Sequence, residues 1–242
     1  MDAVTTPRNR TAIAFACFLA LLGFATVIAM TVRDADAKSA KVIGKTKKTP
    51  DPACPKNCNV AGSVTGFQTV ADGSKGVFKV PSSGRLVAWT LHLGTPSNSD
   101  QDTFNSYFPD NKFKGLPSAR LSILKPKGKS KYKLVKQTPP VALSGKLGSD
   151  PVITLGKPLK VKKGQRVAIT TVTWGSYFAS GLPSNDNKWR ASRNDGTCNE
   201  DAKKAKPQQK KGSTRQYGCQ FKGERLLYWA YFVPGGGKKN ND

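Results

Sequence analysis

Short apolar segments, separated by turns that contain glycine or proline, make up the sequence after residue 37. In residues 85–93 (RLVAWTLHL) and 166–174 (RVAITTVTW), successive side chains alternate between two faces, as they do in a β-strand. Residues 225–233 (RLLYWAYFV) are almost entirely apolar, which is typical of a central buried strand. No segment after residue 37 sustains the i, i+3, i+4 spacing of an amphipathic helix. The sequence therefore predicts an all-β fold.

Turn signals divide the chain into about eight to ten strands, the number expected of an antiparallel β-sandwich or of a closed barrel. Such turns stand at residues 81–84 (PSSG), 125–128 (KPKG) and 162–165 (KKGQ). The segments 119–124 and 132–138 flank the second of these turns, and we expect them to form a hairpin. We predict a two-sheet antiparallel sandwich, with the barrel as the alternative.

Three segments together carry a family resemblance: FKVPSSGRLVAW (78–89), SARLSILKP (118–126) and PLKVKKGQRVAITTV (158–172). Over residues 64–234 this arrangement resembles the jelly-roll modules of secreted bacterial proteins. In those modules a strand ends in a glycine turn, and a later basic-Gly-x-x-Val turn opens a core strand. The resemblance implies a jelly-roll sandwich that serves as a binding or adhesive module, often for glycans and sometimes with a structural Ca²⁺.

An uncharged apolar run occupies residues 11–32 and follows Arg8 and Arg10. The small-x-small site Ala35-Asp36-Ala37 comes next, so residues 1–37 are predicted to be a secretory signal peptide that is cleaved after about Ala37. The run is also long enough, at about 1.5 Å per residue, to span a bilayer. The sequence thus predicts a secreted or extracytoplasmic protein, and the alternative is a membrane anchor formed by residues 11–32.

Composition divides the rest of the chain into three parts. Residues 38–53 (KSAKVIGKTKKTPDPA) lack apolar periodicity and are expected to be a basic flexible linker. Residues 54–234 are predicted to be the β-sandwich domain, and residues 235–242 a disordered tail.

The chain carries 40 Lys and Arg residues against 15 Asp and Glu residues, which gives a formal net charge of +25. Residues 1–37 contain three of each sign, so the whole excess belongs to the exported part. Such a surface attracts anionic polymers, for example acidic polysaccharides or polyphosphates. The alternative is that the lysines only form a solvated surface. Nucleic acid is not favoured as a partner, because the chain carries no nucleic-acid motif and exported proteins seldom meet it.

Four cysteines remain after the predicted signal is removed, and their even number fits an oxidising compartment. We favour the disulfides Cys198–Cys219 and Cys54–Cys58, while the two other connectivities stay open. Zinc is the competing interpretation, but C-x3-C with C-x20-C matches no usual zinc spacing.

Two long segments interrupt the strand pattern, residues 95–117 and 175–217, and long loops often carry function. Their aromatic residues could form a platform that stacks on sugar rings, or they could cap the core instead. The candidates for this platform are Tyr107, Phe108, Tyr177 and Trp189.

The first segment also holds Asp100, Asp102 and Asp110, whose oxygen atoms are of the type that Ca²⁺ prefers. Ordinary turn-forming residues are the alternative, since the spacing is not that of an EF-hand. Between Cys198 and Cys219, the second segment is rich in lysine and could present a basic finger to an anionic surface. Its candidate binding residues are Lys203, Lys204, Lys210 and Lys211.

No catalytic motif is present, and the only histidine, His92, is expected to be a surface or packing residue. We therefore expect an exported, non-catalytic binding module that contacts glycans or anionic polymers of the cell envelope or matrix. The alternatives are a secreted glycan-active hydrolase that uses two carboxylates, or a purely structural envelope protein. The carboxylates available to a hydrolase are Asp102, Asp110, Asp150, Asp186 and Glu224.

Overall fold

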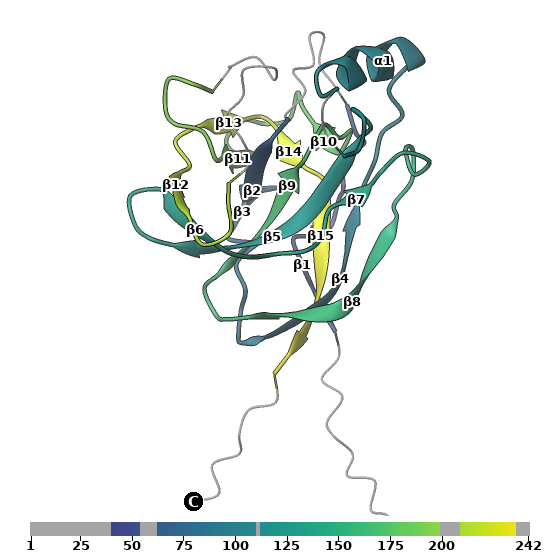
Figure 1. Ribbon diagram of the computed structural model, residues 1–242. Coiled ribbons are helices and arrows are strands. Elements are labelled where there is room, and N and C mark those ends of the chain that lie inside the picture. Colours follow the sequence, from purple (N-terminus) through teal and green to yellow (C-terminus); the bar gives the residue numbers. More distant parts are fainter. Residues whose placement is uncertain (1–39, 54–61, 110–111, 199–208, 236–242) are drawn as a thin grey trace, which may run out of the picture. The chain divides into compact units, whose positions relative to one another are not determined.

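Two antiparallel β-sheets contain most of the residues that this computed structural model describes, 40–53, 62–109, 112–198 and 209–235 (Figure 1). The smaller sheet has the strand order β1-β15-β4-β8. Its strands are β1 (Lys41–Ile43), β15 (Tyr228–Pro234), β4 (Gly84–Leu91) and β8 (Val152–Val161).

The larger sheet has the order β12-β6-β5-β9-β2-β11-β13, with β3 beside β2 and β7 beside β5. Its strands are β2 (Val64–Ala71), β3 (Ser74–Lys75), β5 (Ser118–Pro126), β6 (Lys131–Gln137), β7 (Val141–Ala142), β9 (Arg166–Thr171), β11 (Lys188–Ala191), β12 (Thr214–Gln216) and β13 (Gln220–Lys222). A separate pair consists of β10 (Phe178–Ala179) and β14 (Arg225–Leu226). All pairings between the described strands are antiparallel, so the prediction of an antiparallel β fold is confirmed.

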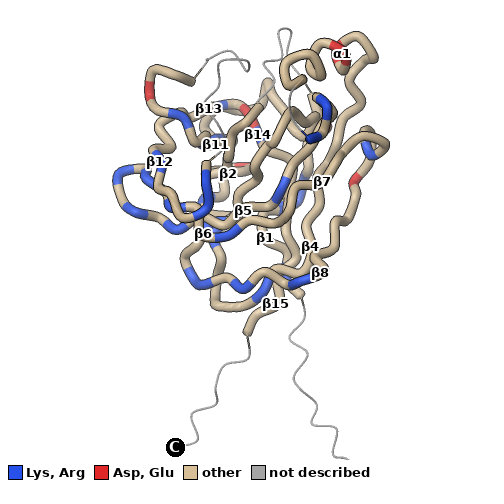
Figure 2. The backbone as a smooth tube through the Cα atoms, in the orientation of Figure 1, with Lys and Arg blue, Asp and Glu red and all other residues tan. Residues whose placement is uncertain are grey.

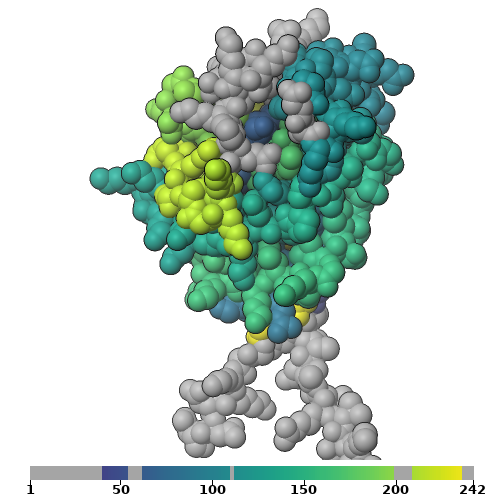
Figure 3. Space-filling view, in the orientation of Figure 1, coloured from purple at the N-terminus to yellow at the C-terminus, as the bar shows by residue number. Residues whose placement is uncertain are grey.

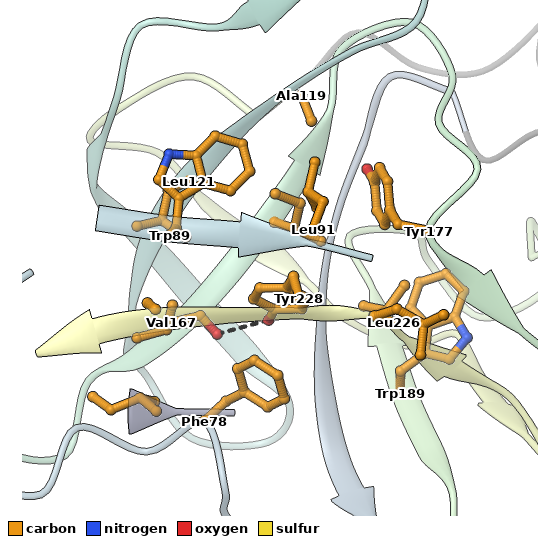
Figure 4. Packing of buried hydrophobic residues seen from close by; sticks show 14 of the residues in the cluster. Phe78, Trp89, Leu91, Ala119, Leu121, Val167, Tyr177, Trp189, Leu226 and Tyr228 are labelled. Carbon is orange, nitrogen blue, oxygen red and sulfur yellow. Dashed lines mark hydrogen bonds between the residues drawn. The ribbon is translucent and has the colours of Figure 1, made fainter. Parts of the chain in front are cut away.

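Side chains from both sheets meet in one hydrophobic core (Figure 4). Trp89 and Tyr228 enter it from the smaller sheet, and Leu121 and Val167 enter it from the larger one. The buried Tyr228 hydroxyl donates a hydrogen bond of 3.0 Å to the Val167 carbonyl, which satisfies its polar end inside the core. The alternating pattern of residues 85–93 and 166–174 thus reflects strands with one face on this core.

The hairpin expected from residues 119–124 and 132–138 is confirmed as the β5–β6 pair. The predicted disulfide Cys198–Cys219 is also confirmed, with its Cα atoms 5.3 Å apart. It closes the segment that leads from β11 to β13. Cys54 and Cys58 lie outside the described residues, as does the predicted signal at 1–37.

One short helix, α1 (Asn98–Ser106), lies in the first long segment, where the sequence pattern indicated no helix. Ser97 caps it, because the Asp100 backbone N–H donates to the Ser97 hydroxyl over 3.2 Å. None of its residues is buried, so it leaves no apolar periodicity in the sequence. No helix in the described part of the chain is long and apolar enough to cross a membrane.

The segment 38–53, expected to be a flexible linker, is instead part of the fold from residue 40 onward. Lys41–Ile43 form β1, which pairs with β15, and the Ala53 N–H donates to the Phe178 carbonyl over 2.9 Å. The sequence analysis missed this strand because β1 has only three residues and its partner β15 follows about 190 residues later, so no local pattern reveals the pairing.

Candidate binding surface and groove

Lysines gather around β6, β8, β12 and the turns next to these strands (Figure 2), and all of them are exposed except Lys133 and Lys136, which are half-buried. We call this surface the basic face. It consists of Lys125, Lys127, Lys129, Lys131, Lys133, Lys136, Lys157, Lys160, Lys162, Lys163, Lys210 and Lys211.

The β5–β6 hairpin contributes most densely to the basic face, because lysine occupies every second position from 125 to 133. Lys125 lies directly opposite Lys133 in the register of the two strands. Like charges that face each other across a strand pair are destabilising. The tip turns through Lys129 and Ser130, which both have positive φ, and this places the Lys129 side chain at the end of the hairpin. The fold therefore holds these charges together despite their repulsion.

Carboxylates do not offset this charge in the described residues. The ion pairs there are His92–Asp150 and Arg225–Asp72, and neither contains a residue of the basic face. In Figure 2 the red segments stand apart from β6 and β12, whereas blue segments surround them. The basic face therefore presents a positive potential to an approaching anion.

Between β6 and β8 the two sheets leave a groove of about 890 Å³, which we call the seam groove. Its apolar lining includes Trp89, Val135, Val141, Ile153, Leu155 and Leu159. Figure 3 shows this part of the surface, coloured teal and green, from the side on which β5 and β6 lie. A neighbouring hollow of about 620 Å³ continues along β8 and shares Val135, Lys136 and Lys160 with the groove.

The seam groove exists because two strand edges run near each other without pairing. β8 is the last strand of the smaller sheet, and β12 covers β6 only over Lys131–Lys133 in the strand register. Residues 155–158 of β8 also bulge away from β4, since Leu86 pairs with Leu159 and Ala88 pairs with Thr154. One side chain crosses the opening: the Lys136 Nζ donates to the Lys160 carbonyl over 2.8 Å.

Two buried N–H donors of residues that line the groove have no hydrogen-bond partner in the described structure, Trp89 Nε1 and Gln137 Nε2. Trp89 is fully buried. A buried donor without a partner costs about 1–3 kcal/mol, so these two nitrogen atoms favour an acceptor from outside the chain.

Of the aromatic residues predicted to form a stacking platform, Tyr177 and Trp189 are 0% and 4% exposed and belong to the core. Trp189 stacks on Phe221 with ring centroids 4.4 Å apart, and its Nε1 donates to Glu224. Neither ring offers a free face to a sugar in this structure, which matches the alternative that these aromatics cap the core. Tyr107 and Phe108 follow α1 and are half-buried.

Asp100 and Asp102, expected as calcium ligands, both lie on α1, and Asp110 lies outside the described residues. Asp100 has a local role, because its backbone N–H and one carboxylate oxygen both bond to the Ser97 hydroxyl. The described residues contain no group of three or more His, Cys, Asp or Glu side chains that could hold a metal ion. Calcium binding remains a prediction.

The predicted basic finger lies only partly within the described residues, because Lys203 and Lys204 fall outside them. Lys210 and Lys211 are exposed and precede β12, which pairs with β6. The structure thus joins these two lysines to the β5–β6 hairpin, whose lysines the sequence analysis missed as a site. The alternation KPKGKSKYK at residues 125–133 is the signal that could have revealed them.

The carboxylates available to a hydrolase lie on separate elements. Asp102 is on α1, Asp150 pairs with His92, Asp186 is exposed ahead of β11, and Glu224 accepts from Trp189. Among the described residues, no two of these carboxylates share a hydrogen-bond partner.

Comparison with known proteins adds no relative: no family model, no curated protein and no solved structure matches the chain.

Proposed function

We propose that the chain is an exported, non-catalytic binding module that holds an anionic polymer of the cell envelope or matrix on its basic face. The two sheets would be the layers of a jelly-roll sandwich, an assignment supported by the single core that they share. Export is supported by the sequence of residues 1–37, which would act as a cleaved signal or as an anchor.

The observation that carries this proposal is the alignment of like charges on the β5–β6 hairpin. Lys125 faces Lys133 across the strand pair, and no described carboxylate neutralises either of them. A solvated surface needs no such arrangement, because scattered lysines keep a protein soluble equally well. A polymer with regularly spaced negative charges would instead bind all of these lysines together and remove their repulsion.

An anionic polymer fits this surface better than a neutral glycan does. Sugar rings bind by stacking on exposed aromatic faces, and Tyr177 and Trp189 are buried. Lysine is a strongly hydrated point charge that binds anions without requiring one geometry, so the basic face would accept sulfated, phosphorylated or carboxylated polymers alike.

Binding of the protein to dextran sulfate, polyphosphate and neutral dextran, each at low and at high salt, tests the proposal. We expect binding to both polyanions at low salt and loss of that binding at high salt, because salt screens exposed charges. Binding to neutral dextran that survives high salt would overturn the proposal in favour of a lectin-like site. A lack of binding to all three polymers would favour a purely structural envelope protein.

A further inference from the structure

We propose that the seam groove is a binding site for a single-chain anionic amphiphile, namely a long-chain carboxylate. Its hydrocarbon chain would lie along the apolar lining, and its carboxylate would take the two donors that have no partner. This inference goes beyond polymer binding on the basic face and does not depend on it.

The lining is suited to a hydrocarbon chain. Val135 and Val141 come from the larger sheet, and Ile153, Leu155 and Leu159 come from β8. All five are only partly buried and pack against the core, so the groove is the place where the core reaches the surface. A ligand chain would remove this apolar area from water. The volume of about 890 Å³ lies within the range of about 300–1,000 Å³ that is usual for small-molecule sites.

The charged side chains at the groove are all cations, and two buried donors stand beside them. Trp89 Nε1 and Gln137 Nε2 are buried donors without partners in the described structure. Lys136, Lys157, Lys160 and Lys211 also line the groove, and no carboxylate among the described residues does. Donors and positive charge beside an apolar lining match a ligand that combines acceptor oxygens, negative charge and a hydrocarbon chain.

An extended peptide that adds a strand to β8 is a poorer fit. The bulge at residues 155–158 interrupts the strand, and Pro158 within it has no N–H to donate. The Lys160 carbonyl already accepts from the Lys136 side chain. Both features are of the kind that protects an edge strand from pairing.

Trp89 itself can report occupancy of the groove, because bromine atoms on a fatty-acid chain quench a tryptophan that they touch. The full chain would be titrated with dibromostearate, and its fluorescence compared with that of Trp89→Phe. The apolar segment 11–32 contains no tryptophan and is identical in both proteins, so quenching by fatty acid bound there would not differ between them. We expect saturable quenching in the wild type and loss of most of it in Trp89→Phe. Equal fractional quenching in both proteins would overturn the proposal.

A matched pair of variants on one strand tests the position of the site. Leu155 lines the groove, whereas Val152 on the same strand is 58% exposed and does not. Leu155→Asp should raise the dissociation constant for dibromostearate at least about tenfold, because a charge would meet the hydrocarbon chain. Val152→Asp should leave it unchanged. An equal loss in both variants would contradict a site in the groove, and urea unfolding would verify that each variant is folded.

The polar end of the site is tested by Gln137→Leu, which removes the amide donor and leaves an apolar, slightly shorter side chain. We expect binding of the fatty acid to weaken about tenfold and binding of the corresponding brominated alcohol to change much less, since hydrogen bonds to charged groups are the stronger ones. Equal loss for both ligands would contradict recognition of the carboxylate.

Displacement of dibromostearate by an acidic peptide, but not by stearate, would overturn the proposal in favour of a peptide site. Gln137→Leu changes no charge, so its binding of dextran sulfate should stay at the wild-type level, and a failure of this inference and a failure of polymer binding are therefore distinguishable.

Discussion

Arg225 links three distant parts of the chain through one buried side chain. It is 3% exposed, and its guanidinium lies 2.9 Å from both carboxylate oxygens of Asp72 and 3.1 Å from the Lys48 carbonyl. It also donates to the Thr46 hydroxyl. These contacts fix the segment after β1 against the turn that joins β2 to β3, which is why this basic segment is ordered rather than a tether.

Replacement of Arg225 by Ala should therefore destabilise the fold. Removal of one partner of a fully buried pair costs about 3–5 kcal/mol, and we expect roughly 2–3 kcal/mol here because the Asp72 side chain is 40% exposed to solvent. Urea unfolding measures this free energy. The exposed Arg85 on β4 provides the control, and Arg85→Ala should change stability by less than about 0.5 kcal/mol. Equal effects of the two substitutions would show that the buried network contributes little.

Three buried tyrosines make the fold sensitive to alkali. Burial raises the pKa of Tyr177, Tyr217 and Tyr228 above the usual value, while hydrogen bonds from Thr90 and Trp229 lower the pKa of the more exposed Tyr231. Above a pH of about 10 the unfolded chain releases tyrosine protons that the folded chain keeps. The unfolded state then binds fewer protons than the native state, so the free energy of unfolding falls as pH rises.

Tyr228→Phe should reduce this alkaline loss by about 1.4 kcal/mol per pH unit above a pH of about 10, since one of the three retained protons is gone. Near neutral pH the same substitution should cost about 1 kcal/mol, because the hydroxyl no longer bonds the Val167 carbonyl. Unfolding in urea from pH 8 to 11 would measure both effects. Lysine titration affects both proteins alike and cancels in the comparison. An unchanged alkaline slope would mean that Tyr228 is not protected from solvent.

At the scale of elements, the disulfide links Cys198, which follows β11, to Cys219, which directly precedes β13. Among the described strands, β13 pairs only with β11. The link closes a segment with a sequence separation of 21 residues. A loop of that length loses most of its freedom in the unfolded chain when the disulfide forms, which favours the folded state.

The double variant Cys198→Ala/Cys219→Ala should lose about 3 kcal/mol of stability on the chain-entropy model. Because β13 carries Phe221, which stacks on Trp189, amide exchange should also accelerate locally in β11 and β13. Hydrogen exchange followed by mass spectrometry resolves these segments, and exchange in β4 serves as the internal reference. Unchanged protection of β13 would show that strand pairing alone holds this edge.

The sequence predicted the elements whose signal is local. The strand containing Trp89 follows from alternation, and the strand containing Tyr228 follows from its continuous apolar sequence. The β5–β6 hairpin follows from its turn, and the disulfide follows from the cysteine pattern. β1 was missed because its three residues pair with β15 far along the chain. The seam groove could not be predicted either, because it depends on how residues 135–137 and 153–160, which are distant in sequence, pack beside each other in the folded structure.

At the scale of the whole molecule, the chain has a formal net charge of +25, and the charged residues within its described part are distributed unevenly over the surface. The basic face collects lysines from three strands and their turns, whereas Asp100 and Asp102 lie on α1 at another part of the surface. This separation allows two hypotheses to be distinguished. If the basic face is a binding surface, removing lysines from it weakens polyanion binding more than removing the same number elsewhere. If the lysines only keep the protein soluble, their position makes no difference.

The most direct test compares two triple variants that each remove three positive charges. The hairpin variant removes three lysine charges at and beside the tip of the β5–β6 hairpin, by the substitutions Lys127→Gln, Lys129→Gln and Lys131→Gln. The control variant removes three exposed lysines outside the basic face, by the substitutions Lys112→Gln, Lys114→Gln and Lys146→Gln. The affinity for dextran sulfate would be measured over a salt series. We expect the hairpin variant to lower the slope of log K against log salt by up to about three, and the control variant to leave it nearly unchanged. Equal slopes for the two variants would contradict the account, since binding would then follow net charge rather than the basic face.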